Sequence, residues 1–390
     1  MFGRVSILLI VALLLGACGS GQPGISTSAV VPTTTAGETG TAAANASTAV
    51  PTTAANETGT PAANGAAATS APSAQATAQP QPTEGAARPL HQITVAMPYI
   101  PNVQFAHLYV ADKKGYYAQE GLQVKFDYNY ETDVVQRIAQ GTVQFGFASG
   151  DSVLLARAQG LPIVTIATNS QKFPVVLFSK ASENIMKPAD LKGKSVGIPG
   201  RFGASYIGLL ALLYANKMSE SDLNLQEIGF AQVAAVTQGK VQVGTGYGNN
   251  EPIQLEQQGI KVNVIRVSDF FPLASDGLIT SESMLKDQAD DVRGFVRATL
   301  RGMQDVLANP DEAFTISLTY IPEAQNSDQQ LQRKVLQATL DYWQSDATKE
   351  HGLGYTDMQS WQATEKFLQD SKILKSDVDL TKAFTNEFIK

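Results

Sequence analysis

The chain repeats itself at an interval of about 100 residues, and this internal repeat limits the possible folds more than any other feature of the sequence. A stretch around a Gln-Gly pair recurs almost unchanged, a second stretch follows it in both copies, and a Val-x-x-Pro tetrapeptide precedes it in both. The matching pairs are residues 140–146 with 238–244, 158–163 with 257–262, and 95–98 with 196–199. One such match could arise by chance, but three in the same order indicate a structural duplication.

Each copy is expected to alternate strands and helices, because short β-branched runs alternate with stretches whose apolar residues recur at helical spacing. We predict strands at residues 93–96, 124–129, 145–148 and 163–167 and helices at 105–120, 132–140 and 152–159 in the first copy. In the second copy we predict strands at 195–198, 225–230, 243–246 and 262–267 and helices at 205–216, 232–238 and 252–258. Such alternation produces a mostly parallel sheet covered by helices on both faces.

Two connecting segments indicate one two-lobed molecule; the alternative is two independent domains in tandem. Residues 172–180 leave the first copy as a strand, and residues 269–280 bring the chain back. Helices predicted near the C-terminus are assigned to the first lobe, at residues 289–308, 310–318, 328–344 and 357–369. The sequence therefore predicts an α/β fold with a first lobe of residues 91–175 and 275–390 and a second lobe of residues 176–274, joined by two crossovers around a cleft.

The N-terminus has the pattern of a secretory signal. Arg4 precedes an apolar run over residues 5–15, which is shorter than the ~20 residues needed to span a bilayer. The run ends in Leu15-Gly16-Ala17-Cys18, which resembles the bacterial lipobox, and this cysteine is the only one in the chain. We therefore predict a lipoprotein signal peptide at residues 1–17 and a lipid on Cys18 that holds the protein at the extracytoplasmic side of the cell membrane. The alternative is an ordinary signal peptide with an incidental cysteine.

Residues 18–90 are predicted to form a disordered tether. Between Gly19 and Leu90 there is no aromatic residue, and Thr, Ala, Ser, Gly and Pro dominate, so this segment cannot bury a core. About 300 residues remain, which is enough for two lobes.

The formal net charge of the chain is −7, which argues against nucleic acid as a partner because phosphate binding requires a basic surface.

Four segments resemble one family of binding proteins. Residues 97–122, 148–152, 190–197 and 246–252 are similar to landmarks of the solute-binding proteins of ABC importers for sulfonates and thiamine pyrimidine precursors. The resemblance covers about residues 93–390 and implies a type II periplasmic-binding-protein fold, a monomer, and delivery of a small molecule to an ABC permease in the membrane. Within this family, the chain looks most similar to the riboflavin-binding lipoproteins of flavin importers.

The candidate binding site lies in four loops that follow equivalent strands, at residues 99–104, 149–152, 201–206 and 247–251. In open α/β sheets, ligands bind outside the carboxyl ends of the strands, and two facing lobes bring these ends together across a cleft. The candidate residues combine aromatic faces with hydrogen-bonding groups: Tyr99, Asn102, Gln104, Ser149, Asp151, Phe202, Ser205, Tyr206, Tyr247, Asn249, Asn250 and Glu251. Some of them have structural alternatives, namely Tyr99 in the core, Phe202 and Tyr206 on a plain helix face, and Asp151 as a helix cap.

The charge of these loops indicates which class of ligand they can bind. Arg201 is their only cation, whereas an anion binder would be expected to carry more positive charge, although helix N-termini can also hold anions. A neutral, aromatic, polyhydroxylated ligand is therefore favoured over sulfonate or nitrate. Together with the resemblance, this points to riboflavin, with a formylaminopyrimidine-type thiamine precursor as the alternative and a sulfonate ranked third.

An enzyme is the competing class, because a pyrimidine-precursor synthase shares this fold. In the similar synthases a cysteine-rich motif and histidines carry the chemistry, but no cysteine follows Cys18 here. The sequence contains no Gly-x-Ser-x-Gly motif, and its three histidines lack metal-ligand spacing. The sequence therefore predicts a non-catalytic binder without a metal or cofactor. A lectin-like or structural surface lipoprotein is a third possibility, which the duplicated lobes argue against.

Overall fold

The computed structural model describes residues 89–323 and 328–390. The predicted signal peptide, Cys18 and the predicted tether up to residue 88 lie outside these residues. Among the described helices, none has both the length and the apolar character needed to cross a membrane.

The first copy of the repeat folds into a five-stranded mixed sheet with the strand order β2-β1-β3-β10-β4. In this sheet, β1 (His91–Met97) pairs in parallel with β2 (Leu122–Tyr128) and with β3 (Phe145–Ser149). The fourth strand, β10 (Asp276–Ser281), is inserted antiparallel between β3 and β4 (Ile163–Thr168). Every residue of β3 and β4 is buried, as expected for strands with helices on both faces.

The second copy forms a sheet of the same design, with the order β7-β6-β8-β5-β9. Here β6 (Ser195–Ile198) pairs in parallel with β7 (Asn224–Glu227) and with β8 (Val243–Tyr247). The antiparallel strand is β5 (Val175–Lys180), which lies between β8 and β9 (Val262–Arg266). The two orders correspond strand for strand, so the predicted duplication is confirmed.

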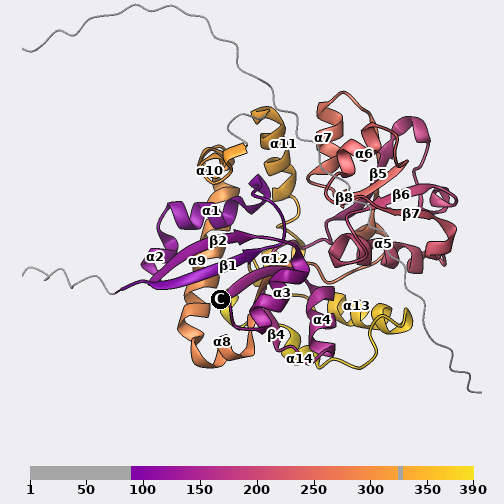
Figure 1. Ribbon diagram of the computed structural model, residues 1–390. Coiled ribbons are helices and arrows are strands. Elements are labelled where there is room, and N and C mark those ends of the chain that lie inside the picture. Colours follow the sequence, from indigo (N-terminus) through magenta and orange to yellow (C-terminus); the bar gives the residue numbers. More distant parts are fainter. Residues whose placement is uncertain (1–88, 324–327) are drawn as a thin grey trace, which may run out of the picture. The chain divides into compact units, whose positions relative to one another are not determined.

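The chain passes between the two sheets twice. It leaves the first sheet after β4 to enter β5, and it returns from β9 to β10. Each crossing therefore delivers the single antiparallel strand of the sheet that it enters. We call each sheet with the helices packed on it a lobe (Figure 1). The α/β fold with two crossovers is confirmed, and the residues at which the predicted lobes begin and end stay predictions.

Helices connect the strands and cover the sheets (Figure 1). They are α1 (Ala106–Lys113), α2 (Tyr116–Gln119), α3 (Glu131–Ala139), α4 (Gly150–Ala158), α5 (Gly203–Ala215), α6 (Gln232–Thr237), α7 (Glu251–Gln257), α8 (Glu282–Asp287), α9 (Ala289–Ala308), α10 (Pro310–Leu318), α11 (Gln329–Leu340), α12 (Asp346–His351), α13 (Met358–Asp370) and α14 (Leu380–Ala383). The single helix predicted over residues 105–120 is wrong. Gly115 adopts a φ of 71° and separates α1 from α2, because glycine enters the left-handed region without steric cost.

Helix α9 packs against the first sheet and against α1. The Phe295 ring is fully buried and stacks on Phe145 of β3, with the ring centroids 4.0 Å apart. On the α1 side, a Cβ atom added to Gly302 would lie 2.2 Å from the carbonyl oxygen of His107. Only glycine therefore permits the two helices to approach this closely.

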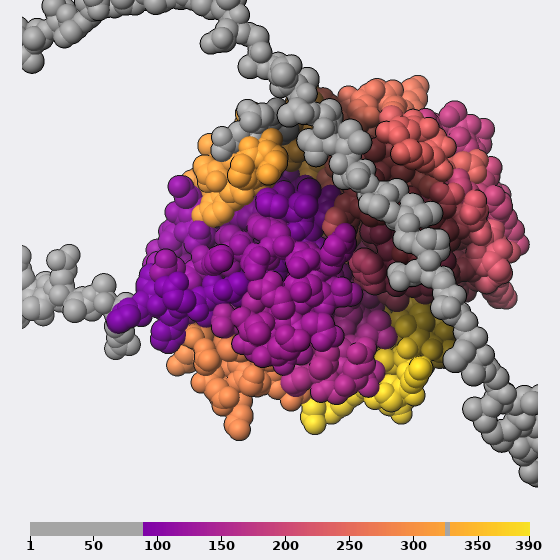
Figure 2. Space-filling view, in the orientation of Figure 1, coloured from indigo at the N-terminus to yellow at the C-terminus, as the bar shows by residue number. Residues whose placement is uncertain are grey.

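Two C-terminal helices contact both lobes rather than the first lobe alone. Helix α13 packs on α4 of the first lobe, and its Phe367 ring lies 5.3 Å from the Tyr214 ring of α5 in the second lobe. Helix α11 contacts the turn before α1, and its Thr339 hydroxyl accepts a 2.9 Å hydrogen bond from the Asn249 amide of the second lobe. Figure 2 shows the yellow C-terminal segment in contact with the magenta surface of the first lobe and the red surface of the second.

Candidate ligand-binding site

A cavity lies between the two lobes, where the carboxyl ends of their parallel strands face each other. Its empty space is about 970 Å³, which includes space that is open to solvent. The residues that line it are Pro98, Tyr99, Gln104, Phe105, Tyr130, Glu131, Phe147, Ala148, Ser149, Asn169, Ser170, Pro174, Pro199, Phe202, Gly203, Ala204, Ser205, Phe230, Gln232, Tyr247, Asn249, Asn250, Glu251, Asp276 and Thr339.

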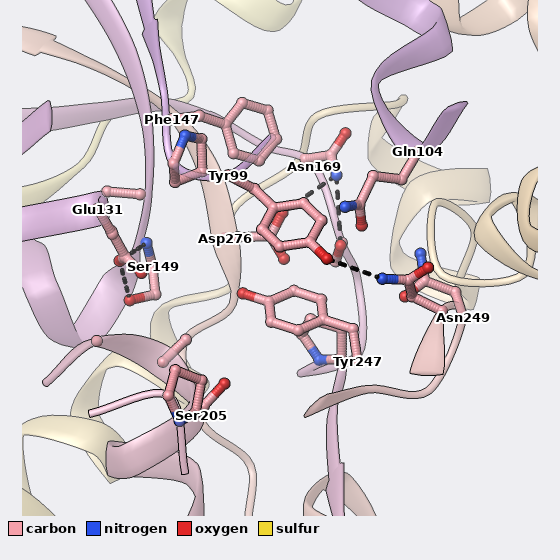
Figure 3. Close-up of a pocket in the computed structure, with 18 of the residues that line it drawn as sticks. Tyr99, Gln104, Glu131, Phe147, Ser149, Asn169, Ser205, Tyr247, Asn249 and Asp276 are labelled. Atoms are coloured by element: carbon pink, nitrogen blue, oxygen red, sulfur yellow. Dashed lines mark hydrogen bonds between the residues drawn. The ribbon is translucent and has the colours of Figure 1, made fainter. Parts of the chain in front are cut away.

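The structure brings nine of the twelve candidate residues to this cavity. From the first lobe these are Tyr99, Gln104 and Ser149, and from the second lobe they are Phe202, Ser205, Tyr247, Asn249, Asn250 and Glu251. Figure 3 shows Tyr99 and Tyr247 projecting into the middle of the cavity, one from each lobe. The rule that ligands bind beyond the carboxyl ends of strands therefore brought most of the candidate residues to the cavity wall.

Three candidate residues do not line the cavity. The Asn102 side chain accepts a 3.0 Å hydrogen bond from the Gln104 backbone N–H, and it thereby caps the turn before α1. Asp151 lies in the first turn of α4 and is fully buried. The Tyr206 hydroxyl donates a hydrogen bond to Glu220, and its side chain lines a separate hollow between α5 and the helices α3 and α4 of the first lobe.

Several lining residues were missed because the sequence analysis considered only four of the strand ends. Tyr130 and Glu131 follow β2, Asn169 follows β4, and Phe230 follows β7, so the same rule applied to those strands would have found them. Asp276 is a different case. It begins the antiparallel strand β10 and reaches the same edge because its strand runs in the opposite direction.

Four aromatic rings form an interlobe aromatic cluster at the edge of the cavity. The Tyr130 ring of the first lobe stacks on Phe230 of the second lobe at 5.0 Å, and it meets Phe202 edge to face at 5.5 Å. The Tyr99 ring contacts Phe230 edge to face at 5.2 Å. Tyr130, Phe202 and Phe230 line the cavity and are 42%, 39% and 43% exposed, so part of each side chain is also accessible to solvent. The cluster therefore forms a direct contact between the two lobes beside the cavity.

The polar part of the wall contains two amide oxygens without a partner among the described residues. The side-chain oxygens of Asn169 and Asn249 are buried and have no hydrogen-bond partner within the described residues. Their amide nitrogens are already used, because that of Asn169 donates to Asp276 at 3.1 Å and that of Asn249 donates to Thr339 at 2.9 Å. Buried acceptors without a partner are costly. Both asparagines line the cavity, so this cost falls on its wall.

Three carboxyl groups add to this acceptor character. Glu131 accepts hydrogen bonds from the backbone N–H of Ser149 at 2.7 Å and from its hydroxyl at 2.5 Å (Figure 3). Glu251 accepts a 2.7 Å hydrogen bond from the Tyr247 backbone N–H, and burial raises its pKa to about 7. Burial likewise raises the pKa of Asp276. None of the lining residues is a lysine, arginine or histidine.

The arginine that the sequence analysis placed in these loops points away from the cavity. The Arg201 guanidinium pairs with Glu220, and its Nε lies 3.4 Å from Glu227. The cavity wall is therefore aromatic, rich in acceptors and acidic, which suits a flat ligand with hydrogen-bond donors and no negative charge. Within the described residues, no cluster of His, Cys, Asp and Glu is arranged to hold a metal ion.

Two similarly built α/β lobes with a cavity between them form the periplasmic-binding-protein fold. A solved structure with this fold is the alkanesulfonate-binding protein SsuA from Xanthomonas axonopodis pv. citri, which has a TM-score of 0.61 at 13% identity and covers 75% of this chain and 98% of that one. The chain belongs to the NMT1/THI5 like family, which matches residues 102–313.

Two relatives in sequence are themselves named as binding proteins. The riboflavin-binding protein RibY of Chloroflexus aurantiacus is 53% identical over 311 residues, which cover 79% of this chain and 89% of the relative. The formylaminopyrimidine-binding protein of Halalkalibacterium halodurans is 28% identical over 302 residues, which cover 76% of this chain and 90% of the relative. The similarity therefore extends over both lobes.

Proposed function

We propose that this protein is the extracytoplasmic solute-binding component of an ABC importer and that its ligand is riboflavin. The observation that carries the proposal is the wall of the cavity, which combines aromatic rings and unpartnered acceptors with the absence of any cationic residue among those that line it. Riboflavin has a flat tricyclic ring, a ring N–H and a chain of hydroxyl groups, and it has no net charge. Stacking on such a ring contributes about 0.5–1.5 kcal/mol beyond its burial.

The identity to the riboflavin-binding relative also supports this ligand. A formylaminopyrimidine-type ligand is the second candidate, because it too is aromatic and rich in N–H donors, and because a relative of lower identity is named for it. A sulfonate is disfavoured, since its negative charge would face Glu131, Glu251 and Asp276 without a cation in the wall. The permease of the importer is the expected partner, and no chemical step is assigned to the site.

Riboflavin binding is expected to quench flavin fluorescence with a dissociation constant below about 1 μM. Quenching is expected because Tyr99 and Tyr247 bring aromatic rings into the cavity. The measurement is a fluorescence titration of the full chain, with calorimetric titrations of a formylaminopyrimidine and an alkanesulfonate as comparison. Heat with the pyrimidine but none with riboflavin would replace the proposed ligand by the second candidate. Binding of the sulfonate alone would contradict the electrostatic argument.

The lipid anchor is a further part of this proposal. Cys18 follows a signal-like apolar run, and a lipid on this residue would leave the binding lobes tethered beside a membrane permease. We expect Cys18→Ser to shift the protein from the membrane fraction to the soluble fraction while the affinity for riboflavin stays the same. The measurement is fractionation after a salt wash, followed by titration of the released protein. Retention of the serine variant on washed membranes would show that another feature of the chain anchors it.

A further inference from the structure

The cavity wall carries carboxyl groups from both lobes. Glu131 begins α3 and Asp276 begins β10 in the first lobe, and Glu251 begins α7 in the second. The groups that donate hydrogen bonds to these carboxyl groups are all neutral: the Ser149 backbone N–H and hydroxyl for Glu131, the Tyr247 backbone N–H and the Asn250 amide for Glu251, and the Asn169 amide and the Ser275 hydroxyl for Asp276. None of these hydrogen bonds therefore comes from a cationic group.

Two positive features near the cavity are already occupied by carboxyl groups of the chain. The first is the amino end of α5, which would attract an anion through its free N–H groups. Helix α5 begins at Gly203, and a Cβ atom added to this glycine would lie 3.5 Å from the Oε2 atom of Glu131. Glu131 therefore lies against this end of the helix. The second is Arg201, which is paired with Glu220 and Glu227 outside the cavity. An anionic ligand would find neither feature free.

We propose that the site accepts the unphosphorylated flavin and excludes flavins that carry a phosphate ester, with Glu131 as the main residue that excludes them. This inference rests on the proposed riboflavin function. A phosphate monoester carries a charge of about −1.5 to −2 at neutral pH, and it would have to enter a cavity whose wall is acidic on both sides. Juxtaposed like charges and the loss of phosphate hydration both disfavour such a complex.

The experiment compares riboflavin with its 5′-phosphate, flavin mononucleotide, on the full chain at pH 8. At this pH the Glu251 carboxyl, whose pKa is raised to about 7, is largely ionised. Riboflavin is expected to bind at least about tenfold more tightly than flavin mononucleotide. The test variant is Glu131→Gln, because glutamine keeps an oxygen that can accept the hydrogen bonds from Ser149 while it removes the charge beside Gly203. We expect the ratio of the two dissociation constants to fall by about tenfold in this variant.

The matched control is Glu350→Gln, which makes the same change of charge on an exposed side chain outside the cavity and is expected to leave the ratio as in the parent chain. If Glu131→Gln fails to fold, as judged by circular dichroism, the same ratio is measured in Glu251→Gln, where it is also expected to fall. The two dissociation constants are measured on the same protein sample. A change in the fraction of correctly folded protein therefore does not affect their ratio.

Each outcome separates this inference from the proposed function. Equal affinity of the parent chain for both flavins would overturn the inference, because the phosphate would then lie outside the cavity, and the riboflavin proposal would stand. Exclusion of flavin mononucleotide that persists in both glutamine variants would assign the exclusion to shape instead of charge and would also overturn it. Failure of both flavins to bind would reject the proposed function itself.

Discussion

Replacing Tyr99 with alanine is expected to weaken riboflavin binding by about 1–3 kcal/mol, or roughly 5- to 150-fold. The Tyr99 ring lies in the middle of the cavity, where it can stack on a flat ligand (Figure 3). The same ring contacts Phe230 of the second lobe at 5.2 Å, and its hydroxyl accepts a 3.4 Å hydrogen bond from the Asn250 amide. The substitution therefore removes both a face for the ligand and a link between the lobes. Calorimetry with riboflavin measures the loss.

Two tyrosine variants serve as controls for this prediction. Tyr99→Phe keeps the ring and removes one neutral hydrogen bond, so we expect it to weaken binding by no more than about 1 kcal/mol. Tyr206→Ala removes a tyrosine that lies outside the cavity and donates a hydrogen bond to Glu220. It is expected to lower the melting temperature with little change in affinity. A loss of affinity in Tyr206→Ala as large as that in Tyr99→Ala would contradict the location of the site.

The second large effect is expected from Asp151→Asn, which should remove much of the pH dependence of folding stability. Asp151 is fully buried, and neither of its carboxyl oxygens has a hydrogen-bond partner within the described residues. Burial, and then the nearby charge of Glu131, raise the pKa of Asp151 from 3.8 to about 8. A raised pKa means that the folded protein holds this proton over a pH range in which the unfolded chain has released it.

The direction of the effect follows from this difference. Stability from the protonated Asp151 is fully present below about pH 4 and is lost as the pH rises towards about 8. Asparagine resembles the protonated acid and does not titrate. We therefore expect the ligand-free parent to lose at least about 2 kcal/mol more unfolding free energy than Asp151→Asn over this range. Urea unfolding at a series of pH values measures the difference.

Asp346→Asn is the control for this measurement. The Asp346 side chain is fully exposed, and its hydrogen bond with Lys349 lowers its pKa. A lowered pKa contributes stability that is lost only as the pH falls, so this substitution cannot remove a decline that occurs as the pH rises. Equal slopes for the parent and Asp151→Asn would show that the Asp151 carboxyl is ionised in the folded protein at neutral pH.

The internal repeat predicted most of the fold. Strand β6 and helix α9 begin and end at the predicted residues. In α9 this accuracy has a physical reason, since its apolar residues keep helical spacing and Pro310 begins the next helix after a break at Asn309. The break at Gly115 was not predicted, because a glycine inside an amphipathic pattern does not reveal whether its φ is positive.

The direction of individual side chains was harder to predict than the position of the loops. Phe202 and Tyr206 are four residues apart, which places them on one face if both are helical. The structure instead begins α5 at Gly203 and leaves Phe202 extended, with a φ of −155°. Phe202 therefore reaches the cavity independently of the helix, whereas Tyr206 lies on the face of α5 that is turned towards α3 and α4.

The acidity of the cavity could not have been deduced from the four loops that the sequence analysis considered. Glu131 reaches the cavity from the start of α3, and Asp276 reaches it from the start of β10. Their convergence depends on which strands are neighbours in the sheet and in which direction each runs. That arrangement is a property of the whole lobe, and no short segment of sequence contains it.

The order of the strands along the chain also sets the order in which the two sheets can be completed during synthesis. The second sheet is built from one continuous stretch, residues 175–266, whereas the first sheet lacks its inner strand until residues 276–281 have been made. At about 5–20 residues per second, the ribosome needs roughly 5–20 s to pass from the end of β4 to β10. During this interval the edges of β3 and β4 are open to pairing with other chains. The lobe whose synthesis begins first is therefore the last to be finished.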